Sequence, residues 1–153
     1  MNKVEVCSSN NQLLINRRSL QTYAVKVLNE IGHGNWVLSI YLCDDNAIKQ
    51  LNSKFRNKNE ATDVLSFEMG VEEQDCKGKI HFIAGDIAIS LETMRQNAKY
   101  FKISEDEELR RLIIHGILHL SGMDHQTNNA DEPMLLLQEK ILGKVGGRVI
   151  NEE

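Results

Sequence analysis

Histidines gather in one short stretch of the sequence, which reads H-G-I-L-H-L-S-G-M-D-H from His115 to His125. His115 and His119 are four residues apart, so on a helix both imidazole rings project from the same face. Two imidazoles so placed can bind one metal ion at about 2.0–2.1 Å each. Gly122 can end the helix in the left-handed conformation, after which the chain can return His125 as a third ligand. Three histidines leave one coordination position open, which predicts a catalytic metal site.

Two neighbours of these histidines bear on the chemistry of the site. Asp124 either orients a histidine as a carboxylate behind the metal or is a solvated turn residue. The spacing of the histidines is that of metalloproteases with the motif H-E-x-x-H-x-x-G-x-x-H, in which the Glu is the general base. Gly116 occupies that position here and cannot accept a proton. The sequence therefore predicts a protease-like metal site without the proton chemistry of a protease, and no general base is evident.

A local concentration of positive charge lies between residues 49 and 59. The segment contains Lys49, Lys54, Arg56 and Lys58 and no acidic residue, although the whole chain has a net charge of −4. These four cations suit the phosphate backbone of RNA, and Arg56 can stabilise a pentacovalent phosphate through paired hydrogen bonds. The alternative is a solvated helix end, because cations favour helix C-termini.

The hydrophobic pattern predicts the elements that must position these residues. Apolar residues at helical spacing predict helices at 20–31, 91–101, 105–120 and 131–142, with a shorter helix after Asp44 and Asp45. Runs of β-branched, aromatic and aliphatic residues predict strands at 3–8, 12–16, 36–43, 62–67, 80–84 and 86–90. The polar stretch 70–79 predicts a hairpin loop. Ser104 and Glu107 form a capping box, so we expect the acidic run 105–108 to begin the histidine-bearing helix rather than bind a metal.

This pattern predicts an α+β fold in which a mixed sheet of about four to five strands packs against helices, with the histidine helix at the active site. The chain has 153 residues, of which 41% are hydrophobic and 26% are charged. These values predict a single domain over residues 1–153 with a core that needs no disulfide or structural metal.

Composition also limits the location and the partners of the protein. Cys7, Cys43 and Cys76 are odd in number and lack C-x-x-C spacing, which favours a reducing cytoplasm. No apolar stretch is long enough for a membrane span or a signal peptide, so no membrane association is expected. A net charge of −4 argues against a protein that coats DNA with a broad basic surface, although a local basic patch stays possible.

Three blocks of the sequence share the motifs of one known family, in the same order and spacing. The run from His115 to His125 resembles H-G-x-L-H-L-x-G-x-D-H. Residues 52–67, which read N-S-K-F-R-N-K-N-E-A-T-D-V-L-S-F, resemble F-R-x-K-x-x-x-T-D-V-L-S-F, and residues 85–90 match G-D-I-x-I-S. These are motifs of the YbeY family of bacterial rRNA maturation factors and metal-dependent endoribonucleases, and together they span most of residues 50–140.

The resemblance implies one zinc ion held by His115, His119 and His125, with Arg56 lining the same cleft. It implies cleavage of single-stranded RNA, maturation of the ends of small-subunit (16S) rRNA, and a part in ribosome quality control. The partners that it implies are rRNA, small-subunit ribosomal proteins and an rRNA-associated GTPase.

Two alternatives stay open beside this interpretation. In the first, the protein is a non-catalytic ribosome assembly factor whose metal braces the fold while the basic segment binds rRNA. In the second it is a metalloprotease, which the glycine at position 116 disfavours. For a nuclease, the attacking group is either water activated by the metal or the RNA 2′-hydroxyl. Three histidines also suit Ni, Cu or Co, so the sequence does not fix the metal.

Overall fold

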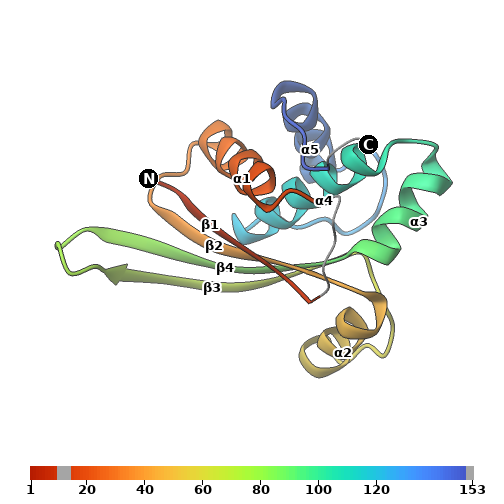
Figure 1. Ribbon diagram of the computed structural model, residues 1–153, viewed down its shortest axis with the longest axis horizontal. Coiled ribbons are helices and arrows are strands. Elements are labelled where there is room, and N and C mark those ends of the chain that lie inside the picture. The colour runs from red at the N-terminus through yellow and green to blue at the C-terminus, as the bar shows by residue number, and fades with distance from the viewer. Residues whose placement is uncertain (10–14, 151–153) are drawn as a thin grey trace.

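The computed structural model describes residues 1–9 and 15–150 and is shown in Figure 1. In chain order its elements are β1 (Lys3–Ser8), α1 (Arg17–Ile31), β2 (Trp36–Cys43), α2 (Asp45–Arg56), β3 (Val64–Gln74), β4 (Ile80–Ser90), α3 (Leu91–Phe101), α4 (Glu105–Leu120) and α5 (Pro133–Lys144). The described residues form a single α+β domain, as predicted. None of the described helices combines the length and the apolar character that crossing a bilayer requires.

The sheet is mixed, with the strand order β1-β2-β4-β3. The pairs β1–β2 and β2–β4 are parallel, whereas β3 and β4 are antiparallel. β3 therefore lies at an edge of the sheet, and β3 and β4 extend past the other two strands as a long twisted hairpin (Figure 1). The predicted mixed sheet of about four to five strands is confirmed by these four described strands.

The β3–β4 hairpin differs from its prediction. A hairpin loop is present, as predicted, but it covers only residues 75–79 and not 70–79, because β3 continues to Gln74 and β4 begins at Ile80. Residues 68–74 are all exposed, so they lack the alternation of apolar and polar residues by which a half-buried strand is predicted. The two strands predicted at 80–84 and 86–90 form the single strand β4.

Smaller differences occur at the two ends of the chain. Of the strand predicted at 12–16, residues 12–14 lie outside the described residues, and Ile15 makes an isolated bridge to Ile150. The last helix begins and ends two residues later than predicted, and Pro133 occupies its first turn, where the missing N–H costs no hydrogen bond.

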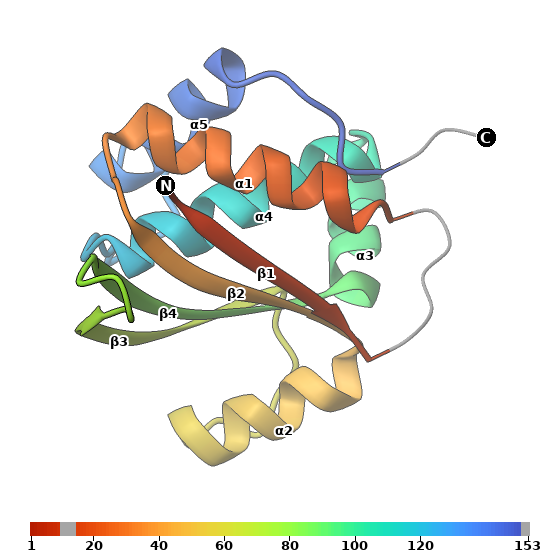
Figure 2. The same ribbon diagram turned by 60° about the vertical axis from the view of Figure 1, so that its left-hand side comes forward.

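The sheet separates two unequal layers of helices. Figure 2 shows α1, α4 and α5 on one face and α2 alone on the other. The main core lies between the sheet and the first group and includes Leu28, Ile40 and Ile113, each fully buried. On the opposite face, Ile48 of α2 packs with a smaller cluster that includes Phe67 of β3. The two faces of β3 therefore look into different layers.

Helix α4 crosses the main layer and carries two of the histidines. It begins where the Ser104 hydroxyl accepts a hydrogen bond from the Glu107 N–H at 3.0 Å, so the predicted cap and the predicted role of the acidic run are confirmed. It ends where the Gly122 N–H donates to the His119 carbonyl at 3.0 Å, with Gly122 at a φ of 93° as predicted. This end turns the chain back toward the helix.

Gly116 lets α4 lie directly against the sheet. A Cβ atom at this position would lie 2.7 Å from Cγ2 and 2.9 Å from Cδ1 of the buried Ile87 in β4. No side chain fits there without displacing the core. The general-base position of the proteases therefore faces apolar packing, away from the histidine rings.

We expect Gly116→Glu to lower the free energy of unfolding by at least about 3 kcal/mol, because it overpacks the core and buries a carboxylate against Ile87. Gly143→Glu is the matched control, since Gly143 lies in α5 and a Cβ atom added there would meet open space. Gly143→Glu should leave the free energy of unfolding unchanged or raise it slightly, because glutamate has a higher helix propensity than glycine. Urea unfolding of both variants measures the difference, and equal effects would contradict the packing explanation.

Candidate metal centre

The three histidines predicted from the sequence meet at one point. His115 and His119 project from α4, and His125 returns from the turn after Gly122. One ring nitrogen of each lies within 4.8 Å of those of the other two, so the group could hold a metal ion. The closest pair is Nε2 of His115 and Nε2 of His119, at 3.1 Å.

The opposite ring nitrogen of each histidine faces an oxygen atom. These contacts are His115 Nδ1 to Gln138 Oε1 at 2.6 Å, His119 Nδ1 to the Met123 carbonyl at 3.1 Å, and His125 Nδ1 to the Thr127 carbonyl at 2.9 Å. Carbonyl oxygens only accept hydrogen bonds, so each Nδ1 carries the proton. In the neutral ring Nε2 then keeps its lone pair. The three lone pairs are thus available at the point where the rings meet.

The positions of the His115 and His119 rings agree better with a bound metal ion than with two neutral rings that have no cation between them. Two Nε2 lone pairs at 3.1 Å repel each other unless a cation lies between them. Around a tetrahedral zinc ion with bonds of about 2.0–2.1 Å, two ligand nitrogens are about 3.3 Å apart. The donor set, its tautomers and its spacing therefore agree with a three-histidine metal site.

The pKa values of His115 and His119 also favour the neutral, metal-binding form of the rings. Burial lowers the pKa of His115, although the hydrogen bond to Gln138 opposes this effect. Burial and the neighbouring His115 and His125 lower the pKa of His119. Both rings therefore stay neutral to lower pH than a free histidine does, and the neutral ring is the form that binds metal.

A cavity of about 870 Å³ opens beside the histidines, which line it together with Asp63, Glu108, Arg111 and Glu139. Its size is in the range of small-molecule sites. Sequence reasoning missed these four charged residues as members of the site. They come from α4, α5 and the loop that precedes β3, and no local motif groups them.

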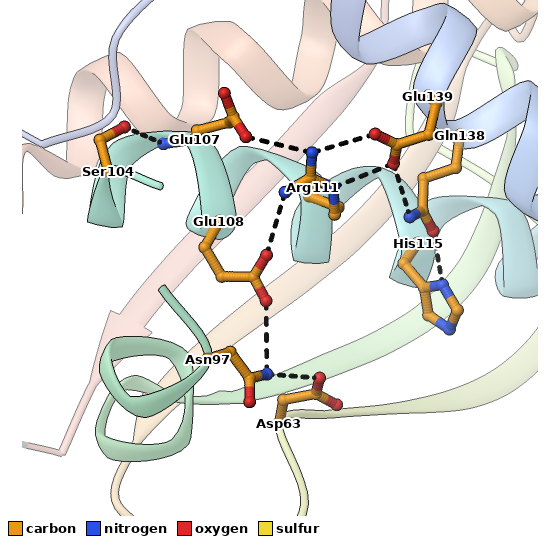
Figure 3. A network of polar contacts seen from close by, with 9 residues as sticks. All are labelled: Asp63, Asn97, Ser104, Glu107, Glu108, Arg111, His115, Gln138 and Glu139. Carbon is orange, nitrogen blue, oxygen red and sulfur yellow. Dashed lines mark hydrogen bonds and ion pairs between the residues drawn. The ribbon is translucent and has the colours of Figure 1, made fainter. Parts of the chain in front are cut away.

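Figure 3 shows how the charged residues of the cavity are connected to His115. Arg111 donates to both carboxylate oxygens of Glu139, at 2.9 and 3.0 Å, and to Glu108 at 3.2 Å. Gln138 donates from Nε2 to Glu139 at 3.1 Å, which leaves its Oε1 to accept from His115. Hydrogen bonding to Arg111 lowers the pKa of Glu139, so this carboxylate stays ionised. Arg111 thus holds Glu139, Glu139 orients the amide of Gln138, and that amide holds the ring of His115.

The far side of this network reaches Asp63. Asn97 of α3 donates to Asp63 at 3.0 Å and to Glu108 at 3.3 Å. Burial raises the pKa of Glu108, and its bonds to Arg111 and Asn97 offset part of that rise. Asp63 is the cavity carboxylate that has no ion pair with Arg111 among the described residues.

We expect Gln138→Met to weaken metal binding about 10- to 100-fold, because His115 loses the acceptor that fixes its tautomer. Lys140→Met is the control, since Lys140 is exposed on the same helix. Competition against a chelator at fixed pH measures the metal affinity of both variants. Equal affinity of Gln138→Met and the wild type would show that Gln138 does not orient the ligand.

The structure does not place Arg56 among the residues that line this cavity. Arg56 is the last residue of α2, where its Nη2 donates to the Ser66 carbonyl and its guanidinium lies 5.4 Å from the centre of the Phe67 ring. Ser66 links it to the histidine helix, because the Ser66 hydroxyl donates to the Gly116 carbonyl at 3.2 Å. Lys54 and Lys58 are exposed near Arg56, and Lys49 is exposed earlier on α2.

Asp124 is exposed and acts on the main chain. Its Oδ1 accepts from the His125 N–H at 2.8 Å. The negative charge of Asp124 also acts on His119, where it opposes the lowering of the pKa. Asp124 therefore stabilises the turn that delivers the third histidine.

The fold and the site together define a single-domain α+β protein with a three-histidine site of the kind found in metal-dependent hydrolases. Residues 5–146 match the family model described as "Endoribonuclease YbeY". The chain therefore belongs to the YbeY family, as the three sequence blocks predict.

Individual relatives agree with this assignment. "Endoribonuclease YbeY" of Treponema denticola is 46% identical over 123 residues, which cover 80% of this chain and 79% of that protein. The protein of the same name from Treponema pallidum is 48% identical over 122 residues, covering 80% of this chain and 76% of that protein. The fold is similar to the solution structure of TM1509 from Thermotoga maritima, with a TM-score of 0.61, 26% identity, and coverage of 93% of this chain and 88% of that one.

Proposed function

We propose that this protein is a zinc-dependent endoribonuclease that cleaves single-stranded RNA during maturation of small-subunit rRNA ends and in ribosome quality control. One zinc ion is held by Nε2 of His115, His119 and His125. The observation that carries the proposal is that all three Nδ1 atoms donate to oxygen, so three lone pairs converge on one point. The family membership supplies the substrate class.

A bound zinc ion supplies Lewis-acid chemistry, polarising a phosphoryl oxygen or lowering the pKa of water toward about 7. The residues of the chain hold the three rings in the form that binds the ion. Gln138 and the Met123 and Thr127 carbonyls keep the three rings in the metal-binding tautomer. Burial of His115 keeps that ring neutral.

Arg56 is the cation of the proposed reaction. Its side chain lies over the Phe67 ring and bonds to the Ser66 carbonyl, which holds the guanidinium at the edge of β3. In this position Arg56 stabilises the charge that develops on a phosphate at the strand edge. Lys49, Lys54 and Lys58 hold the flanking backbone by charge, since none of them forms an ion pair among the described residues.

The proposal has a cellular context that follows from the family resemblance. The protein acts in the cytoplasm, as one domain over residues 1–153. It works on rRNA beside small-subunit ribosomal proteins and an rRNA-associated GTPase. The metalloprotease alternative has no support in the site, because position 116 packs on Ile87 and has no room for a carboxylate.

Cleavage of a single-stranded 3′ fragment of small-subunit rRNA tests the proposal. The same fragment annealed to its complement is the matched substrate, and each is incubated with and without a chelator. We expect cuts only in the single strand and only without the chelator. Equal cleavage in the presence of the chelator, or of the duplex, would overturn the proposal.

A further inference from the structure

An exposed aromatic side chain lies beside Arg56 on the face of the sheet opposite the histidines. Phe55 is 57% exposed at the end of α2. Its ring meets the Phe67 ring edge-on, with centroids 5.4 Å apart. The Lys54 ammonium lies 5.3 Å from the centre of the Phe55 ring. Aromatic rings alternating with cations are the typical platform for single-stranded nucleic acid.

The charge around Phe55 favours a polyanion. Residues 49–59 carry four cations and no acidic side chain. Another exposed aromatic pair, Tyr100 and Phe101, lies at the end of α3. Phe101 lines the cavity that also contains the carboxylates of Asp63, Glu108 and Glu139. The α2 surface is therefore the better match for a phosphate backbone.

The edge of β3 connects this surface with the histidines. The Ser90 N–H bonds the Asp63 carbonyl at 2.9 Å, just beyond the pair Val64–Ile89. In an antiparallel ladder this makes Ser66–Ile87 a non-hydrogen-bonded pair, so the Ser66 carbonyl points away from β4. It points to the free edge of β3, on which no described strand pairs. Arg56 bonds to that carbonyl.

Ser66 of β3 thus lies at the boundary between the layer of the histidine helix and the layer of α2. The Ser66 hydroxyl points to the Gly116 carbonyl of the histidine helix, while Phe67 packs on the α2 side. A flexible single strand can follow this path around an edge strand, whereas a stiff duplex cannot bend so tightly. Arg56 sits where the path crosses the edge.

We propose that single-stranded RNA bound at the histidine site crosses the free edge of β3 at Ser66 and stacks an unpaired base on Phe55. Of the two phosphates that flank this base, Arg56 contacts the reacting one at the strand edge and Lys54 contacts the other. The inference rests on the proposed function, and it adds a base-stacking subsite that explains why Arg56 lies outside the histidine cavity.

Binding of a short single-stranded RNA that carries the fluorescent base 2-aminopurine tests the subsite without requiring cleavage. We expect Phe55→Ala to weaken binding about tenfold and to abolish the stacking-induced quenching. Phe55→Trp should restore both, because the ring is retained. Tyr100→Ala is the matched control, an exposed aromatic on α3 outside the subsite, and should bind like the wild type.

An RNA of the same length with abasic sites separates stacking from charge, and we expect Phe55→Ala and the wild type to bind it equally. If Phe55→Ala binds the normal RNA as tightly as the wild type does, the subsite is overturned and the aromatic surface is left for a protein partner. If the wild type never cleaves RNA but its binding depends on Phe55, the proposed function fails while the subsite stands. If the wild type cleaves RNA but Phe55→Ala binds RNA as tightly as the wild type does, the subsite fails while the proposed function stands.

Discussion

His119→Ala is expected to abolish RNA cleavage and to weaken zinc binding at least about a hundredfold. A four-ligand structural zinc site binds with about 10–16 kcal/mol, so one ligand accounts for roughly 3 kcal/mol. His119 contributes one of the three converging Nε2 atoms, 3.1 Å from that of His115. Zinc content after dialysis and cleavage of a single-stranded rRNA fragment are measured on the same preparation.

The thermal stability of this variant separates loss of a ligand from loss of the fold. Without metal, His119→Ala should unfold at a temperature close to that of the wild type, because the substitution removes a lone pair that repels the lone pair of His115. With zinc at a hundredfold excess over its dissociation constant, the wild type should gain about 2.7 kcal/mol and the variant far less. If His119→Ala loses the fold while the wild type itself shows no RNA turnover, the non-catalytic assembly-factor alternative is favoured.

Arg56→Ala is expected to lower kcat about 10²- to 10³-fold while zinc content stays that of the wild type. The loss corresponds to removal of one donor to the charge that develops in the transition state. Arg56→Lys should recover little of it, because an ammonium lacks the paired N–H geometry of a guanidinium. Single-turnover cleavage at saturating RNA isolates this step from binding.

Lys58→Ala is the control for a general effect of charge. Lys58 is exposed, two residues beyond Arg56. Its loss should raise KM slightly and reduce the salt dependence of RNA binding by about one unit, with kcat unchanged. Equal loss of kcat in both variants would mean that Arg56 acts only as one of several backbone cations.

Local sequence signals are sufficient to predict much of the fold. The Ser104 cap, the four-residue spacing of His115 and His119 and the turn at Gly122 each depend on residues close in sequence, and each is confirmed. The prediction fails at the hairpin because residues 68–74 are exposed and carry no burial pattern. Backbone pairing with β4 across the hairpin turn makes them a strand, and such pairing leaves no apolar alternation in the sequence when both faces are exposed.

The environment of the site depends on contacts between residues far apart in the sequence. Gln138 is 23 residues from His115 in sequence, and nothing near either residue predicts that they meet. The residue type alone shows that Gly116 cannot act as a base. The physical reason for a glycine there, a 2.7 Å contact of a Cβ atom with Ile87, needs the packing of α4 on β4. The position of Arg56 at the edge of β3, outside the cavity, likewise follows from the strand order.

Restoration of activity by zinc tests the central claim most directly. Wild type and His119→Ala are purified in parallel, stripped of metal with a chelator, and assayed on the single-stranded rRNA fragment before and after addition of one equivalent of zinc. We predict that both stripped proteins are inactive and that zinc restores cleavage to the wild type alone. Cleavage by the stripped wild type, or equal restoration in His119→Ala, would contradict the assignment of the three histidines as the metal site of a ribonuclease.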